Sequence, residues 1–219
     1  MTSVPVEALS RADRLIGLLG RAPVIPVITI ERLADAVPLA RALVAGGLPL
    51  LEVTLRTEAG RDAAAAIIAE VPDAIVGVGT VLTTMDLARC REIGARFAVS
   101  PGATTELLNA AEQSDVPFLP GIATASELMA AVGRGFTTVK FFPAVPAGGI
   151  AALKALAGPF PLVRFCPTGG INEANAAEWL ALSNVIVVGG SWLTPESDVR
   201  AGAWEKISER ARRACLLRR

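Results

Sequence analysis

The stretch "VIPVITIERL", from Val24 to Leu33, decides between the two α/β architectures that suit this chain. It begins as a β-branched run typical of a strand and passes into a helical pattern without any glycine. An open doubly wound sheet usually has a glycine-rich dinucleotide-binding turn after its first strand. Because this turn is missing, the stretch favours a closed barrel over the open sheet, which is the alternative.

Outward from Val24, the chain repeats the alternation of a short β-branched run and a longer amphipathic stretch rich in alanine and leucine. The runs start about 20 to 26 residues apart, which leaves room for one strand, two loops and one helix. They are "VIPVITI" from Val24, "LPLLEVTL" from Leu48, "AIVGVGTV" from Ala74, "FAVSPG" from Phe97, "PFLPGI" from Pro117, "TTVKFFPA" from Thr137, "LVRFCPTGG" from Leu162 and "VIVVGGSWL" from Val185. Strict alternation implies parallel strands, and eight such units predict a (β/α)₈ TIM barrel.

One domain is expected over residues 1–219, because no linker or low-complexity stretch divides the chain. Residues 1–22 are predicted to contain an extra leading amphipathic helix, and residues 23–219 to form the barrel. The apolar residues expected on one face of the leading helix are Leu9, Leu15, Ile16 and Leu19.

The composition narrows the class of partner. Lys+Arg and Asp+Glu number 21 each, so no basic excess points to nucleic acid or to an anionic membrane. No apolar run reaches membrane-spanning length, and the first 20 residues lack the basic start and cleavage site of a signal peptide. The three cysteines, Cys90, Cys166 and Cys215, fit neither a disulfide framework nor a metal-ligand spacing. We therefore expect reduced thiols in a cytoplasmic protein.

Histidine is absent, which excludes a Ser-His-Asp or Cys-His nucleophile and any His-ligated metal. A site for magnesium made of carboxylates alone stays open. In an enzyme of this composition, proton transfers fall to a carboxylate or to a neutral amine.

One of only three lysines lies inside a strand-like run, "TTVKFFPA", where Val139, Phe141 and Phe142 surround Lys140 with apolar side chains. A lysine in a strand is ordinarily at a solvated edge, but every strand of a closed barrel is covered on both sides. An unpaired ammonium there is unfavourable, and desolvation favours the neutral amine. Lys140 is therefore a candidate nucleophile.

Polar residues gather where the predicted strands end, which is where barrel enzymes carry their chemistry. Glu52, Thr54 and Arg56 alternate along the second run and so point to one face. Thr80 closes the third run and Pro101 follows the fourth. Glu52 and Arg56 suit either a site or a purely structural ion pair.

Two glycine clusters follow the last two runs: "PTGGI" at Pro167 to Ile171 and "VGGSW" at Val188 to Trp192. Loops after strands seven and eight of this fold often bind phosphate through backbone N–H groups, and glycine lets the backbone approach the anion. A single Gly-Gly is commonly a plain turn. Two clusters at these strand ends predict a phosphorylated small-molecule ligand.

These residue types suit a class I aldolase. A neutral lysine amine attacks a ketone to form a Schiff base, whose electron withdrawal lets a nearby C–C bond break without a metal. Glu52 is the candidate that removes the hydroxyl proton and later returns a proton to the enamine. Arg56 could hold a substrate carboxylate with two hydrogen bonds.

Seven motifs in order along nearly the whole chain resemble those of the 2-keto-3-deoxy-6-phosphogluconate (KDPG) and 4-hydroxy-2-oxoglutarate (KHG) aldolase family. They are "GGLPLLEVTLRT", "VGVGTVL", "VSPG", "LPGIATASE", "VKFFPA", "FCPTGGI" and "VGGSWL". The resemblance implies reversible cleavage of KDPG to pyruvate and D-glyceraldehyde 3-phosphate, the lyase step of the Entner–Doudoroff pathway, and in many members cleavage of KHG to pyruvate and glyoxylate.

Position by position, the resemblance implies that Lys140 is the Schiff-base lysine, Glu52 the general acid/base and Arg56 the ligand of the pyruvate carboxylate. It places Thr80, Pro101, Phe142 and Thr168 around the pyruvate half of the substrate, and Gly169, Gly170, Gly190 and Ser191 around the phosphate. It further implies a homotrimer and no metal or other cofactor. One departure is "VPAGG" after "FFPA", where Pro146 stiffens a loop near the distal end of the substrate.

Three alternatives stay open at this level. The same chemistry could act on the phosphogalactonate epimer or on KHG alone. A phosphosugar isomerase on the same fold would use Glu52 as a base and Lys140 only as a charge. A non-enzymatic barrel would bind a phosphorylated metabolite without turnover.

Overall fold

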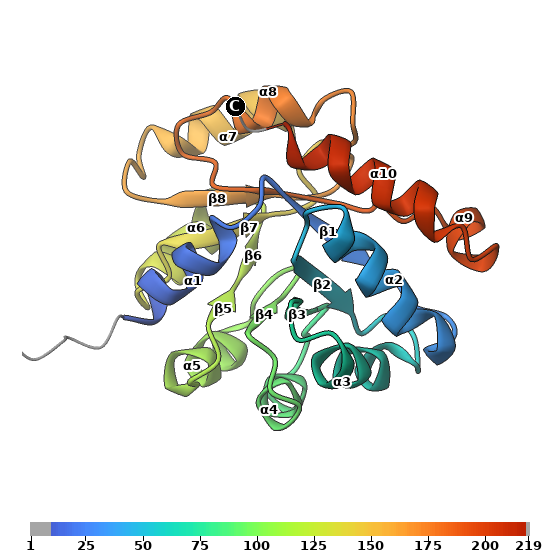
Figure 1. Cartoon of the computed structure of the whole chain (residues 1–219). Coiled ribbons are helices and arrows are strands. Elements are labelled where there is room, and N and C mark those ends of the chain that lie inside the picture. The colour runs from blue at the N-terminus through green and yellow to red at the C-terminus, as the bar shows by residue number, and fades with distance from the viewer. Residues whose placement is uncertain (1–9, 218–219) are drawn as a thin grey trace, which may run out of the picture.

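The computed structural model describes residues 10–217, with short parallel strands at the centre and helices around them (Figure 1). The strands are β1 (Val24–Ile28), β2 (Leu50–Thr54), β3 (Ile75–Gly79), β4 (Phe97–Val99), β5 (Phe118–Leu119), β6 (Gly121–Ile122), β7 (Thr138–Phe141), β8 (Arg164–Pro167) and β9 (Val188–Gly190). Each predicted run contains a strand, so the predicted α/β class with parallel strands is confirmed.

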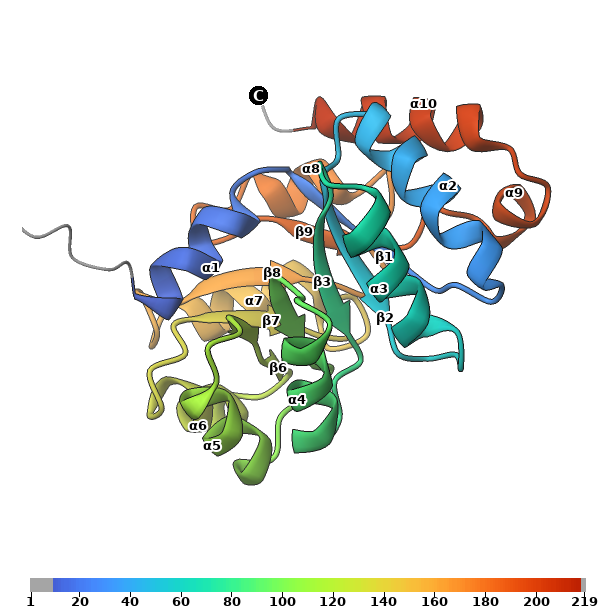
Figure 2. The same ribbon diagram turned by 60° about the horizontal axis from the view of Figure 1, so that its bottom comes forward.

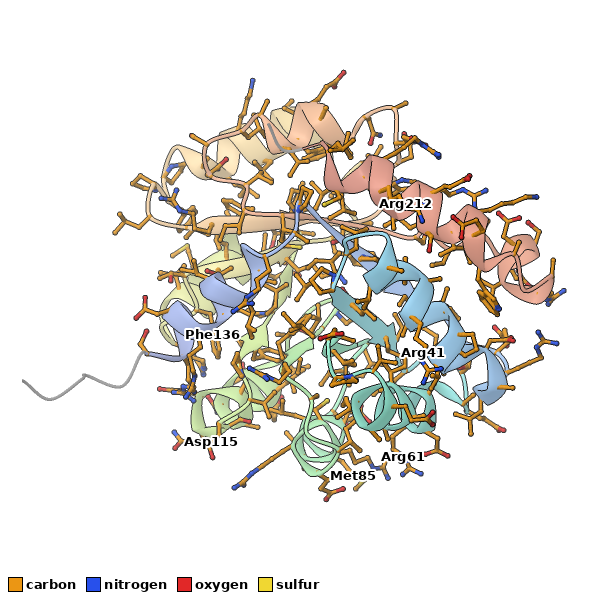
Figure 3. The ribbon with its side chains drawn as sticks, viewed as in Figure 1. Arg41, Arg61, Met85, Asp115, Phe136 and Arg212 are labelled. Atoms are coloured by element: carbon orange, nitrogen blue, oxygen red, sulfur yellow. The ribbon has the colours of Figure 1, made fainter. Side chains whose placement is uncertain are left out.

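The helices lie outside the strands, as a second view also shows (Figure 2). They are α1 (Arg11–Leu19), α2 (Leu33–Ala45), α3 (Gly60–Glu70), α4 (Thr84–Glu92), α5 (Thr105–Gln113), α6 (Ala125–Val132), α7 (Gly149–Ala157), α8 (Ala176–Leu180), α9 (Glu196–Arg200) and α10 (Trp204–Cys215). Polar side chains cover their outer surfaces, among them Arg41, Arg61 and Arg212 (Figure 3).

Hydrogen bonding divides the strands into a six-stranded sheet, β5-β4-β3-β2-β1-β9, and a three-stranded sheet, β6-β7-β8. The fifth predicted run is split into β5 and β6 at Pro120, which has no N–H to donate to a neighbouring strand. The other edges of the two sheets are β8 and β9, and Thr168, which follows β8, forms an isolated parallel bridge with Gly189 of β9. The result is a curled parallel sheet.

Burial of both faces explains why the strands are apolar almost throughout. All five residues of β1 and all five of β2 are buried, as expected for parallel strands under helices. Phe97, Phe141 and Phe165 are fully buried and fill the core. Burying each such ring contributes about 2 to 3 kcal/mol to stability.

The predicted leading helix is present as α1, and Ser10 caps its N-terminus. The Ser10 Oγ accepts a hydrogen bond from the Asp13 N–H at 3.1 Å. Leu15 and Leu19 are buried as expected. The prediction is wrong for Ile16, which is 37% exposed, because it lies about 100° around the helix from Leu15. Leu9 lies outside the described residues.

Long-range polar contacts fix the first and last helices. The Arg11 guanidinium donates to the carbonyls of Ala111 at 3.2 Å and Ser114 at 2.9 Å, at the end of α5. The Ser208 hydroxyl of α10 donates to the Ala42 carbonyl of α2 at 2.6 Å, and α10 lies beside α2 in both views (Figures 1 and 2). Within residues 10–217, the helices lack the combined length and apolarity needed to cross a bilayer.

Candidate active site

Two sequence-predicted residues from different sheets meet at the centre of the molecule. Lys140 lies on β7 and Glu52 on β2, and the Lys140 Nζ donates to the Glu52 Oε1 at 3.0 Å. The residues are 3% and 2% exposed. A buried ion pair of this kind is weak support for stability, so its position calls for a chemical role.

Space for the Glu52 carboxylate comes from a glycine on the neighbouring strand. Gly79 ends β3, and a Cβ atom built on it would lie 2.3 Å from the Glu52 Oε1. No side chain fits at that distance. Gly79 therefore lets the carboxylate stand between β2 and β3 and reach Lys140.

The other neighbours of Lys140 are apolar or weakly polar. The Phe142 ring lies with its centroid 5.3 Å from the Lys140 Nζ, within reach of a cation–π interaction. Cys166 is paired with Lys140 in the β7–β8 register. Burial raises the pKa of Cys166 to about 12, although the charge of Lys140 acts to lower it. Cys166 is thus a neutral thiol packed in the core and not a nucleophile.

The residues predicted around the pyruvate half follow the carboxyl ends of their strands. Thr80 comes directly after β3, Pro101 soon after β4, and Thr168 directly after β8. Thr80 has a φ of 61°, which is rare for a β-branched residue and typical of functional sites. Thr168 is 5% exposed, and its N–H donates to the Phe141 carbonyl at 2.9 Å. Parallel pairing places these strand ends at one edge.

Arg56 differs from the others because it is exposed, two residues beyond the end of β2. It forms no ion pair with the described residues, and the partner of Glu52 is Lys140. The structural ion pair between Glu52 and Arg56, considered from the sequence, is therefore absent. The Arg56 guanidinium is free to bind a ligand.

The two glycine clusters also lie at this edge. Gly169 and Gly170 follow β8 with φ values of 102° and 79°, a left-handed backbone that favours glycine. Gly190 ends β9 and is buried, whereas Ser191 after it is exposed. The backbone of a left-handed glycine turn and an exposed hydroxyl are both groups that suit an oxyanion.

Sequence reasoning missed a hydroxyl pair near Glu52. The Thr29 Oγ1, just after β1, lies 3.3 Å from the Thr54 Oγ1 on β2. The Thr54 hydroxyl donates to the Ile28 carbonyl at 2.9 Å. The available signal was the period-2 alternation of "VITI", which places Thr29 on the same face as Val27.

A buried amine next to a carboxylate, surrounded by apolar groups, suits proton exchange between the two and covalent attack by the amine. Among residues 10–217, there is no group of three or more His, Cys, Asp or Glu side chains arranged to hold a metal ion. Lys140 and Glu52 together supply an amine and a carboxylate.

A profile of the family described as "KDPG and KHG aldolase" matches residues 15–210. The chain belongs to the KDPG and KHG aldolase family. Within this family, it is 54% identical over 197 residues to the KHG/KDPG aldolase of Escherichia coli strain K12, with 90% of this chain and 92% of that protein covered.

Solved structures of KDPG aldolases agree with the fold. That of Legionella pneumophila, with pyruvate captured as a covalent carbinolamine intermediate, has a TM-score of 0.88 and 50% identity, covering 90% of this chain and 96% of the other. That of Zymomonas mobilis ZM4 with 3-phosphoglycerate has a TM-score of 0.89 and 44% identity, covering 96% and 98%.

Proposed function

We propose that the protein is a class I aldolase that reversibly cleaves KDPG to pyruvate and D-glyceraldehyde 3-phosphate. The observation that carries this proposal is the buried contact between Lys140 and Glu52. Membership of the KDPG and KHG aldolase family and the 54% identity to a KHG/KDPG aldolase support it.

In the proposed reaction, Glu52 takes a proton from Lys140 along their 3.0 Å hydrogen bond. The neutral Nζ attacks the C2 carbonyl of the substrate to give a carbinolamine, whose hydroxyl takes the proton from Glu52 and leaves as water, so that an iminium remains. Glu52, again ionised, removes the proton of the C4 hydroxyl. The C3–C4 bond breaks, its electron pair moves to the iminium nitrogen as an enamine forms, and the aldehyde departs.

The enamine carbon then takes the proton from Glu52, and water hydrolyses the resulting iminium to release pyruvate and free Lys140. Glu52 therefore acts first as the base and then as the acid, and the iminium formed on Lys140 serves as the electron sink. We propose that no metal or other cofactor takes part, because these two side chains supply the acid, the base and the nucleophile.

The remaining site residues are assigned proposed positions along the substrate. Arg56, exposed beyond β2, binds the pyruvate carboxylate. The residues that line the pyruvate half are Thr80, Pro101, Phe142 and Thr168. The residues that hold the phosphate are Gly169, Gly170, Gly190 and Ser191. The left-handed turn at Gly169 and Gly170 supports the phosphate assignment.

We further propose that the sheet closes as a (β/α)₈ barrel in a single domain over residues 1–219. Two observations support closure: Pro120 alone separates β5 from β6, and the Thr168–Gly189 bridge links β8 to β9. We also propose a homotrimer in the cytoplasm. The free Cys90, Cys166 and Cys215 fit a reducing compartment.

Borohydride reduction in the presence of pyruvate tests the proposed chemistry. Mass spectrometry should locate a reduced pyruvate adduct on Lys140, and Lys140→Ala should abolish both the adduct and turnover. Lys154→Ala is the matched control, because this lysine is exposed on α7. An adduct on another residue would contradict the assignment of Lys140. Absence of any adduct would favour the phosphosugar isomerase.

Glu52→Gln separates imine formation from proton transfer. We expect the adduct still to form, while pyruvate release in a coupled dehydrogenase assay falls by at least about 100-fold, as is usual when a general acid/base is lost. Full turnover in this variant would exclude the proton-transfer role. If even the unaltered protein releases no pyruvate but is stabilised by the ligand, the non-enzymatic alternative holds.

Comparing rates on KDPG, its phosphogalactonate epimer and KHG tests the substrate. We expect the highest kcat/KM on KDPG. A preference for the epimer would keep the mechanism but change the substrate, and activity on KHG alone would remove the phosphate from the proposal.

A further inference from the structure

The inference concerns the hydroxyl pair formed by Thr29 and Thr54. The Thr54 hydroxyl is fully buried, and its single proton is used in the bond to the Ile28 carbonyl at 2.9 Å. In the 3.3 Å contact between the two hydroxyls, Thr29 must therefore be the donor and Thr54 the acceptor. The lone pairs of the Thr29 oxygen remain available to accept a further hydrogen bond.

The register places this acceptor close to the reacting atoms. Val27 pairs with Glu52, and Ile28 with Val53, so the next pair up the strands is Thr29 with Thr54. Side chains two residues apart on a strand share a face. The two hydroxyls therefore lie on the face of Glu52, one step nearer the carboxyl ends of the strands.

The strand order places Thr29 between the two ends of a phosphorylated substrate. The order β2-β1-β9 sets Glu52 on one side of Thr29 and Ser191, after β9, on the other. A cavity of about 400 Å³ has both Thr29 and Ser191 in its wall, together with Val27 and Thr194. Thr29 is exposed toward it. A ligand that spans from Glu52 to Ser191 must pass Thr29.

We propose that Thr29 is a specificity-determining residue, whose oxygen accepts a hydrogen bond from the substrate hydroxyl that lies between the cleaved bond and the phosphate. In KDPG this is the hydroxyl on C5, because the C4 hydroxyl faces Glu52 and the phosphate is on C6. The contact selects aldehydes that carry a hydroxyl next to the carbonyl carbon. This inference rests on the proposed aldolase function.

The contact is tested by removing the Thr29 hydroxyl from the protein and, separately, the hydroxyl from the aldehyde. Pyruvate is added to D-glyceraldehyde 3-phosphate and to 3-oxopropyl phosphate, which lacks the hydroxyl, by the unaltered protein, Thr29→Val and Thr29→Ser. We expect Thr29→Val to lower kcat/KM for glyceraldehyde 3-phosphate about 5- to 10-fold, the effect of one neutral hydrogen bond. Its kcat/KM for 3-oxopropyl phosphate should stay within about 2-fold. Thr29→Ser should restore the preference.

The other outcomes overturn the inference. Equal losses for both aldehydes would show that Thr29 only supports the structure, and no loss for either would show that it does not touch the substrate. Deuterium exchange at the methyl group of pyruvate is measured in parallel, because it needs Lys140 and Glu52 but no aldehyde. Absence of exchange in the unaltered protein would refute the proposed function, and this inference with it.

Discussion

Residue 79 shows how closely one position controls the site. A methyl group at Gly79 would lie 2.3 Å from the Oε1 of Glu52 and 2.7 Å from its Cγ. Gly79→Ala must therefore displace the carboxylate from Lys140. Because a displacement of about 1 Å can lower a rate 100-fold, we expect kcat to fall by about 10- to 100-fold. Steady-state pyruvate release measures the effect.

The control for this substitution is Gly102→Ala, since a Cβ at Gly102 meets no other atom within 4 Å. It should leave kcat within about 2-fold of the unaltered protein. A Gly79→Ala protein with normal turnover would show that the carboxylate can move without consequence, and would remove the positional argument for Glu52.

At the residue scale, the sequence predicted the central pair because each member breaks a local rule. Lys140 is a charge inside an apolar run, and Glu52 alternates with Thr54 on a buried strand. The Thr29–Thr54 contact could not be predicted in this way. It depends on the register between β1 and β2 and on which oxygen donates, and neither is encoded in local periodicity.

At the scale of the element, α6 has a well-defined start. The Thr124 Oγ1 accepts from the Glu127 N–H at 3.3 Å, and the Glu127 carboxylate accepts from the N–H groups of Ala123 at 2.8 Å and Thr124 at 2.9 Å. Thr124→Ala should lower the free energy of unfolding by about 1 kcal/mol. Denaturant unfolding measures it, with the exposed Thr105→Ala in α5 as a control that should change little. Equal effects would contradict a capping role.

This cap is also sensitive to pH. Partial burial acts to raise the pKa of Glu127, but the hydrogen bonds from Ala123 and Thr124 outweigh it and lower the pKa below its usual value. Because the pKa of Glu127 is lowered on folding, its ionised carboxylate stabilises the fold at a pH above the pKa that it has in the unfolded chain. This stabilisation is lost as the pH falls through the pKa that it has in the folded protein. The stability difference between the unaltered protein and Glu127→Gln should therefore shrink on acidification.

The strands were predictable as elements because both of their faces are buried, which makes them continuous apolar runs. Their ends were less so. The run from Leu48 gives a strand only from Leu50, and the run from Val185 only from Val188. The break at Pro120 could have been inferred from proline alone, whereas the outward position of Ile16 on α1 depends on how the helix is rotated against the core.

At the scale of the whole molecule, two apolar side chains lie exposed where α4 begins. Leu82 is 57% and Met85 61% exposed, and Met85 projects from α4 away from the strands (Figure 3). We expect these two side chains to lie in the surface that joins the proposed trimer. Leu82→Glu combined with Met85→Glu should then convert the trimer to a monomer, and light scattering measures the change in mass. Leu162→Glu, at an 82% exposed residue between α7 and β8, is the control. An unaltered protein that is already a monomer would refute the trimer.

The alternation of strands and helices predicts parallel pairing across the whole molecule, because a parallel strand needs a crossover helix. Pairing between the first and last strands is a different matter. The sequence favoured it over an open sheet mainly by lacking a glycine-rich turn, whereas the structure pairs Val24 of β1 with Val188 of β9 directly.

The pairing of β1 with β9 also determines when each edge of β1 finds its partner during synthesis on the ribosome. One edge of β1 is satisfied early, by β2, but its other edge waits for β9, near the end of the chain. A nascent polypeptide therefore carries an open, apolar strand edge for most of its translation. Such edges are sites of intermolecular association, so the exposed edge of β1 is the place where two incomplete copies would pair before β9 has been made.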